Sequence, residues 1–240
     1  MRLERRLDGT WTFREKGALT WNEACVPGCV HSDLFRCGLI EDPFYRDNEL
    51  GLQELDRKDW EYRLVFDLLP EELKYARRSL LFEGLDTYAT LHLNGKPILE
   101  TRNMFTAHSV ELGDLLRPEG NELLIHFRSP ISVDLSKALA NGFLYPADND
   151  QSRLGGLEDI KISVFVGKAP YQYGWDWGPR FLSCGIWKPI SIVCFEEASI
   201  SGLFIEQKSL SASRAQLAIH VDIESAVQTT RLLSLSWGAP

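Results

Sequence analysis

The strongest constraint on the fold is a two-residue alternation of side chains over residues 60–68. Trp, Tyr, Leu, Phe and Leu stand at the even positions, and Glu, Arg, Val and Asp stand at the odd ones. Successive side chains of a strand point to opposite faces, so this pattern predicts a strand with one buried and one solvated face. Half-exposed strands of this kind are typical of antiparallel sheets.

A hairpin is predicted around Asn94-Gly95, which separates the runs 87–93 and 96–99, because both residues tolerate positive φ. Helical patterns are confined to residues 32–37, closed by Gly38, and 133–140. Further strands are expected at residues 79–82, 108–112, 122–128, 160–166 and 190–195. The series predicts an all-β sandwich with short connecting helices.

The composition changes after residue 195, where Trp and Gly become rarer and Ser, Ala and Gln separate short alternating runs. Three strands are expected there, at residues 200–207, 216–224 and 229–236. A sandwich needs about seven strands, so this segment is too short to close a core of its own. We therefore expect one complete domain over residues 1–195 and an incomplete second β domain over residues 196–240.

The charge balance and the lack of long apolar runs argue against a nucleic-acid partner, a signal peptide and a membrane span. Lys and Arg number 26 against 34 Asp and Glu, a formal charge of −8, and no basic block is longer than a pair. We therefore expect no nucleic-acid partner. The charged N-terminus has no apolar run behind it, and no window of about 18 apolar residues exists, so neither a signal peptide nor a membrane span is expected.

The five cysteines form an odd set, and the chain has no Asn-x-Ser/Thr acceptor, which together favour a reducing, cytosolic location. Cys25 and Cys29 precede His31, but the usual two-residue spacing and a second ligand pair are absent. Free buried thiols are the better interpretation, and we expect neither a metal nor a cofactor. His31 is expected to cap or orient the short helix that follows it rather than to bind a ligand.

The most unusual stretch is Tyr171-Gln-Tyr-Gly-Trp-Asp-Trp-Gly-Pro-Arg180, with four aromatic residues and one acid. Aromatic rings stack on the C–H faces of sugars, while carboxylate and guanidinium groups bind hydroxyls. Gly174 and the Gly-Pro break favour a loop at a strand end over an extended strand. The alternative is a Trp-rich corner of the core in which Asp176 pairs with Arg180 for structural reasons.

Several blocks carry a family resemblance when they are taken in order. They are Leu7-Asp-Gly-Thr-Trp11-Thr-Phe13, Val26-Pro-Gly-Cys-Val-His31-Ser-Asp-Leu34, Asp42-Pro-Phe-Tyr45, Asp59-Trp-Glu-Tyr-Arg63, Phe82-Glu-Gly-Leu-Asp-Thr87, Leu93-Asn-Gly95, Asn103-Met-Phe105, Trp175-Asp-Trp-Gly-Pro-Arg180 and Cys184-Gly-Ile-Trp-Lys-Pro-Ile190. Together they resemble the N-terminal part of β-mannosidases of glycoside hydrolase family 2.

The resemblance implies a jelly-roll, galactose-binding-like sugar-binding domain over residues 1–195, followed by the first strands of an immunoglobulin-like domain. The family removes terminal, non-reducing β-D-mannose from oligosaccharides or glycoprotein-derived glycans with retention. Its two catalytic Glu residues lie on a (β/α)8 barrel, which this chain lacks. Accordingly Glu23, Glu49 and Glu122, each preceded by Asn, are not assigned a catalytic role, and the chain alone is expected to be inactive.

The resemblance also implies one substrate contact in the first domain. Asp176 is expected to reach hydroxyls of the terminal mannose, supported by Trp175, Trp177 and Arg180. The preceding segment departs from the family pattern, because Gly167 and Pro170 stand where Arg and Gln are usual, on either side of Lys168-Ala169. This departure weakens any role for Lys168. The pair Glu83 and Asp86 could bind a cation or simply line a turn, and the turn is the better interpretation.

Three hypotheses follow from these observations. The chain is the N-terminal part of a β-mannosidase, a free-standing carbohydrate-binding β-sandwich that does not cleave, or a non-catalytic scaffold whose aromatic residues form core. Hydrolysis of p-nitrophenyl β-mannoside by this chain would contradict the absence of the barrel carboxylates. Mannose binding that is lost in Asp176→Ala would support the second hypothesis, and no binding in either form would leave the first, with an incomplete site, or the third.

Overall fold

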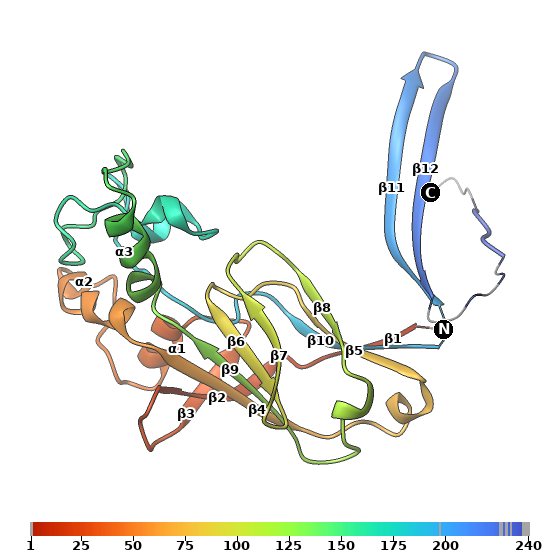
Figure 1. Ribbon diagram of the computed structural model, residues 1–240, viewed down its shortest axis with the longest axis horizontal. Helices are drawn as coiled ribbons and strands as arrows, with labels where there is room; N and C mark the ends of the chain where they lie inside the picture. The colour runs from red at the N-terminus through yellow and green to blue at the C-terminus, as the bar shows by residue number, and fades with distance from the viewer. Residues whose placement is uncertain (1, 197, 226–227, 229, 231, 237–240) are drawn as a thin grey trace.

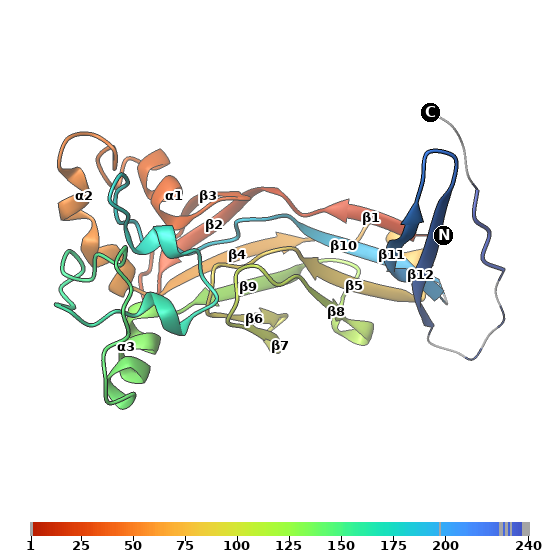
Figure 2. The ribbon, with the colours of Figure 1, turned by 90° about the horizontal axis from the view of Figure 1, so that it is seen from above.

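The computed structural model describes residues 1–240 except residues 1, 197, 226–227, 229, 231 and 237–240. Two antiparallel sheets face each other and form a sandwich (Figures 1 and 2). In spatial order, the first contains β1 (Arg2–Arg6), β10 (Ile190–Phe195), β5 (Arg77–Phe82) and β8 (His108–Glu111). The second contains β3 (Asn22–Val26), β2 (Gly9–Glu15), β4 (Trp60–Phe66), β9 (Asn121–Phe127), β6 (Ala89–Leu93) and β7 (Lys96–Thr101).

The core fills the space between the two sheets. Phe13, Tyr62 and Phe127 from the six-stranded sheet are fully buried, as are Phe82 and Ile192 from the four-stranded one. Burial of each such side chain is worth about 1.5–3 kcal/mol, so the facing sets of apolar residues are what hold the sheets together. The expected all-β sandwich of jelly-roll type is confirmed.

Most of the predicted strands are present within one or two residues. The alternating segment 60–68 forms β4, and Asn94 and Gly95 adopt φ of 52° and 79° in the turn between β6 and β7. The strand predicted at residues 160–166 is wrong. A short 3-10 helix, η4 (Ser163–Phe165), occupies that segment, and the Asp150 carboxylate accepts the backbone N–H groups of Ile162 and Ser163, which a neighbouring strand would otherwise bind.

Most of the helical elements gather at one end of the sandwich (Figure 1). They include α1 (Val30–Arg36), α2 (Asn48–Gly51), α3 (Pro130–Ala140) and two 3-10 helices, η1 (Gln53–Arg57) and η5 (Pro170–Tyr173). Tyr62 Oη donates to Asp33 Oδ2 at 2.8 Å and so ties α1 to the sheet. Burial raises the pKa of Asp33. A small apolar cluster that includes Ile131, Ile162 and Tyr173 packs α3 against the loop 150–182.

Two further 3-10 helices, η2 (Glu72–Lys74) and η3 (Gly113–Leu115), lie in loops of the sandwich. Beyond the sandwich, β11 (Ala198–Leu210) and β12 (Ala215–Ser225) pair with each other as a two-stranded sheet. This hairpin projects from the end of the sandwich opposite the helices (Figures 1 and 2).

The first two strands predicted after residue 195 are thus present and longer than expected. In the third predicted strand, 229–236, residues 229 and 231 lie outside the described part of the chain, and the described residues 230 and 232–236 form no strand. The division at residues 195 and 196 into a complete and an incomplete immunoglobulin-like domain stays a prediction.

Candidate functional site

The Trp-Asp-Trp segment forms a tight loop at the helical end of the sandwich. It follows η5, and Trp175 and Gly178 exchange backbone hydrogen bonds of 3.3 and 3.5 Å across the turn. Gly174, with φ of 104°, lies so close to Gln151 that a Cβ would stand 2.7 Å from its side chain. Only glycine fits this position, so the loop alternative, rather than the extended strand, is the one that the structure contains.

The loop presents its acidic and aromatic groups outward. Trp177 is 79% exposed, and its ring lies 5.9 Å from that of Trp175. No described residue forms a hydrogen bond or ion pair with the Asp176 carboxylate, which is exposed. A hollow of about 490 Å³ surrounds these groups, and its other walls come from Pro43, Phe44, Arg46, Glu49, Gln151, Leu154, Gly178 and Pro179. The arrangement leaves a carboxylate free to accept hydroxyl donors beside aromatic surface.

Arg180 lies below the loop rather than in the hollow. Its guanidinium is 1% exposed, and Nη1 donates to Asp56 Oδ2 and to Gln53 Oε1, both at 2.5 Å. Burial raises the pKa of Asp56, and the charge of Arg180 opposes that shift. The alternative in which Asp176 pairs with Arg180 is therefore wrong, because Arg180 pairs with Asp56 instead. It anchors the C-terminal end of the loop to η1.

Backbone contacts complete this anchor. Arg180 N donates to Glu49 Oε1 at 2.6 Å, and Gln53 Nε2 donates to Arg180 O at 3.0 Å. At the other end of the loop, Gln151 Nε2 donates to Trp175 O at 2.7 Å, and Gln151 N donates to Tyr173 O at 2.8 Å. The loop is thus held on both sides while its tip stays free. Sequence reasoning missed these partners, because they lie more than 20 positions away and belong to no local pattern.

A second polar cluster lies beneath the segment that precedes the loop. Lys168 Nζ contacts Asp86 Oδ1 at 2.5 Å and Ser183 O at 2.6 Å, and Gln172 Nε2 donates to Asp86 Oδ2 at 2.9 Å. Lys168 and Asp86 are almost completely buried. The interpretation of Asp86 as a residue that simply lines a turn misses this buried cluster. Lys168 and Gln172, the partners of Asp86, are separated from it by 82 and 86 positions in the chain, so local sequence does not reveal them.

His31 borders this cluster. Its Nδ1 lies 3.0 Å from Ser183 Oγ, and its ring centroid is 5.5 Å from that of Phe181. Burial, together with the charge of Lys168, lowers the pKa of His31 to about 4, so the imidazole is neutral at pH 7. His31 lies inside α1, whose N-cap is Cys29, so the expectation that it caps the helix is wrong. Its contact with Ser183 holds α1 against the segment that follows the loop.

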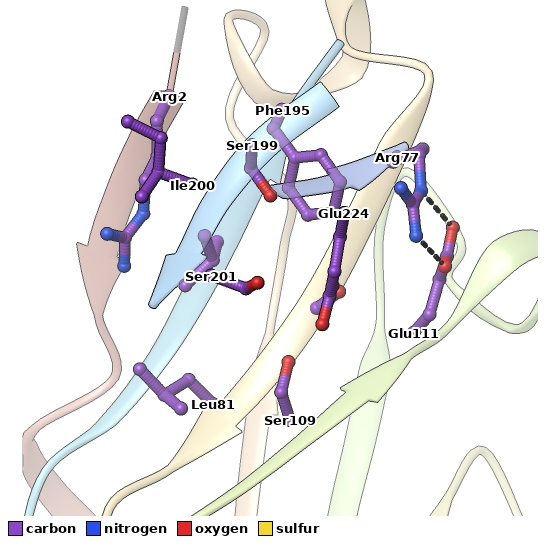
Figure 3. Close-up of a pocket in the computed structure, with 12 residues that line it drawn as sticks. Arg2, Arg77, Leu81, Ser109, Glu111, Phe195, Ser199, Ile200, Ser201 and Glu224 are labelled. Atoms are coloured by element: carbon purple, nitrogen blue, oxygen red, sulfur yellow. Dashed lines mark hydrogen bonds and ion pairs between the residues drawn. The ribbon is translucent and has the colours of Figure 1, made fainter. Parts of the chain in front are cut away.

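A different hollow lies at the far end of the sandwich, beside the base of the hairpin (Figure 3). There Arg77 Nε and Nη2 donate to the two carboxylate oxygens of Glu111, and this hydrogen bonding lowers the pKa of Glu111. Ser199, Ile200 and Glu224 from β11 and β12 complete its wall. In the part of the chain that the structure describes, no three His, Cys, Asp or Glu side chains converge on a common point. Cys25 is exposed and Cys29 is partly exposed, so the expectation of buried thiols is wrong at these two positions. No described helix is long and apolar enough to span a membrane.

Two packed antiparallel sheets with an exposed aromatic and acidic loop at one end define the chain as a β-sandwich. Residues 11–188 match the family described as glycosyl hydrolase 2 galactose-binding domain-like. The chain belongs to this family. The structure also superposes on the β-D-mannosidase of Dictyoglomus thermophilum with a TM-score of 0.83 and 39% identity, over 93% of this chain and 26% of that one.

Two curated relatives show the same relation. "Beta-mannosidase B" of Thermothelomyces thermophilus is 39% identical over 203 residues, which cover 83% of this chain and 23% of the relative. "Beta-mannosidase" of Capra hircus is 32% identical over 190 residues, 79% of this chain and 21% of the relative. The chain thus spans about a quarter of the length of these relatives, and its expected resemblance to the N-terminal part of family 2 β-mannosidases is confirmed.

Proposed function

We propose that this chain is the mannose-contacting, N-terminal part of a retaining β-mannosidase that removes terminal, non-reducing β-D-mannose. The observation that carries the proposal is the free Asp176 carboxylate on a loop that is fixed at both ends and flanked by Trp175 and Trp177. The relatives that match most of the chain carry the name β-mannosidase, which supports this choice of sugar.

The contribution of this part is binding and orientation. A carboxylate can accept hydrogen bonds from two hydroxyls of one sugar, and bonds to a charged group are worth about 1.5–3 kcal/mol each. Retention needs two carboxyl groups about 5 Å apart, one that protonates the leaving oxygen and one that attacks the anomeric carbon. We assign both to a (β/α)8 barrel of the same protein, outside the part that this sequence matches. A carboxylate fixed by a rigid loop would hold the mannose in register with that pair.

The test is a calorimetric titration of the chain with methyl β-D-mannoside and, as the C2 epimer, methyl β-D-glucoside. We expect the mannoside to bind more tightly, and Asp176→Asn to weaken its binding at least tenfold, since the variant keeps the shape but loses the charge. Asp114→Asn, an exposed acid in η3, is the matched control and should change nothing. Mannoside affinity that is equal in the native chain and Asp176→Asn contradicts the proposal.

A free-standing carbohydrate-binding sandwich is the second candidate, favoured by the 79% exposure of Trp177, which offers a stacking face without any further domain. The two candidates differ in whether a longer protein that contains this segment hydrolyses mannosides. Hydrolysis of p-nitrophenyl β-mannoside by a protein in which this segment is joined to a barrel, with none by residues 1–240 alone, supports the enzyme.

We also propose a cytosolic location, supported by five cysteines that are all unpaired in the structure.

A further inference from the structure

A second cavity, of about 440 Å³, lies next to the Asp176 hollow and shares Pro43 and Phe44 with it as a common wall. Its surface is largely aromatic and apolar, and the walls include Phe35, Phe44, Met104, Tyr171, Phe181 and Trp187. Phe44 and Phe181 meet edge to face at 5.3 Å between ring centroids. Trp187 is fixed by a 2.9 Å hydrogen bond from Nε1 to Met104 O. Contacts within the wall thus hold Phe44 against Phe181 and Trp187 against the backbone of Met104.

No described Lys or Arg lines the cavity, and one ring nitrogen of His31 is free to bind a ligand. Asp86 is neutralised by Lys168, and Asp42 at the rim adds a negative charge, which disfavours an anionic ligand. His31 is neutral at pH 7, and while Nδ1 is engaged with Ser183, Nε2 has no hydrogen-bond partner among the described residues. An uncharged ring that stacks on aromatic walls and offers one hydroxyl to an imidazole nitrogen matches this surface.

We propose that this cavity binds the uncharged ring of the leaving group, a pyranose or an aryl ring, of a mannoside whose mannose contacts Asp176. The assignment to the leaving group rests on the proposed function, because it requires mannose in the neighbouring hollow. Pro43 and Phe44 line both hollows, so a ring in this cavity and a mannose at Asp176 would lie on adjoining surfaces. The cavity would then select substrates by the shape of the second ring.

Cys29 gives a direct reporter of occupancy, since it lines the cavity and is a free, partly exposed thiol. Cys25 is exposed, does not line the cavity and serves as the internal control. We would measure the alkylation rate of each thiol by iodoacetamide and mass spectrometry, with phenyl β-D-mannoside, methyl β-D-mannoside or phenol present. We expect phenyl β-D-mannoside to slow alkylation of Cys29 at least fivefold and to leave Cys25 unchanged, whereas the methyl mannoside protects neither.

Affinity gives the second readout. Phenyl β-D-mannoside should bind about tenfold more tightly than the methyl mannoside, because the phenyl ring removes apolar surface from water. Tyr171→Ala removes a wall that is 60% exposed and should abolish this difference, while Phe143→Ala, which removes an aromatic side chain of 59% exposure outside the cavity, should preserve it. Both positions are largely exposed, so neither change threatens the core.

The outcomes separate this inference from the proposed function. Equal affinity for the two mannosides with no protection of Cys29 overturns the inference and leaves the Asp176 contact intact. Failure of the methyl mannoside to bind overturns the proposed mannose contact at Asp176, and protection of Cys29 by phenol in that case still supports a ring-binding cavity. Protection of Cys29 that persists in Tyr171→Ala contradicts the assignment of the ring to these walls.

Discussion

The ion pair between Arg180 and Asp56 is predicted to be the main anchor of the Trp-Asp-Trp loop, and Asp56→Ala is the change that tests it. Both side chains are at most 2% exposed. Arg180 Nε and Nη2 already lack partners among the described residues, as does Asp56 Oδ1. After the substitution, Gln53 Oε1 is the one described acceptor left for a buried guanidinium.

The expected cost follows from this burial. Breaking a buried pair leaves an uncompensated charge and costs about 3–5 kcal/mol of the free energy of unfolding. Arg153 and Asp159 form the matched control, because this pair of the same residue types is 73% and 66% exposed. Exposed pairs are worth about 0–1 kcal/mol, so Asp159→Ala should change stability little. The double variant Asp56→Leu/Arg180→Met should recover most of the loss, because it removes both charges together.

The assay is urea unfolding of each variant, followed by tryptophan fluorescence. A second readout is the affinity for methyl β-D-mannoside under conditions in which the variant is folded. We expect Asp56→Ala to lose affinity along with stability, whereas the exposed-pair variant keeps both. A cost below about 1 kcal/mol for Asp56→Ala, equal to that of the exposed pair, would refute the reasoning, because a surface-like cost means that no charge is left stranded.

Three further predictions concern packing, pH and the hairpin. Gly155→Ala would place a Cβ 2.5 Å from the buried Arg180 guanidinium and should lower the free energy of unfolding by about 1–3 kcal/mol. Gly51→Ala, whose Cβ would have nothing within 4 Å, is the control and should not destabilise the chain. Equal urea midpoints for the two variants would contradict this prediction. The pKa of His31 is about 4 in the folded chain and near 6.5 in the unfolded chain. Between these two values the unfolded chain binds a proton that the folded chain does not. The free energy of unfolding should therefore fall by about 2 kcal/mol between pH 7 and pH 5 because of this group. His31→Gln should remove that slope, and an unchanged slope in urea titrations refutes the assignment. A chain that ends at Glu196 should aggregate less than the full one in light scattering, because β11 and β12 expose apolar side chains on both strands; greater aggregation of the shorter chain contradicts this.

Much of the sandwich could be predicted from alternation, but strand partners could not. The pattern in residues 60–68 corresponds to β4, while residues 160–166 alternate equally well and form no strand. Periodicity reports which side chains are buried, and it does not report which group binds the backbone N–H. For Ile162 that group is the Asp150 carboxylate. The edge strand β1, Arg-Leu-Glu-Arg-Arg, was not predicted, since one apolar residue among five gives no signal.

The candidate site was predictable only at its tip. Glycines and a proline around Trp175-Asp-Trp177 indicate a loop, because each restricts or extends the accessible φ in a local way. The anchors could not be foreseen, because Arg180 binds Asp56 at a separation of 124 positions and Lys168 binds Asp86 at 82. Such pairs depend on the packed sheets and not on neighbours in sequence.

The central claim is that the loop around Asp176 contacts mannose, and the indole N–H signals of the tryptophans test it most directly. In 15N-labelled chain titrated with methyl β-D-mannoside, we expect the signals of Trp175 and Trp177 to shift, since these rings flank the hollow. Trp11, buried and bonded through Nε1 to Leu7 O, should stay fixed. The same shifts should vanish in Asp176→Asn. An unchanged spectrum for Trp175 and Trp177 at saturating mannoside would contradict the account.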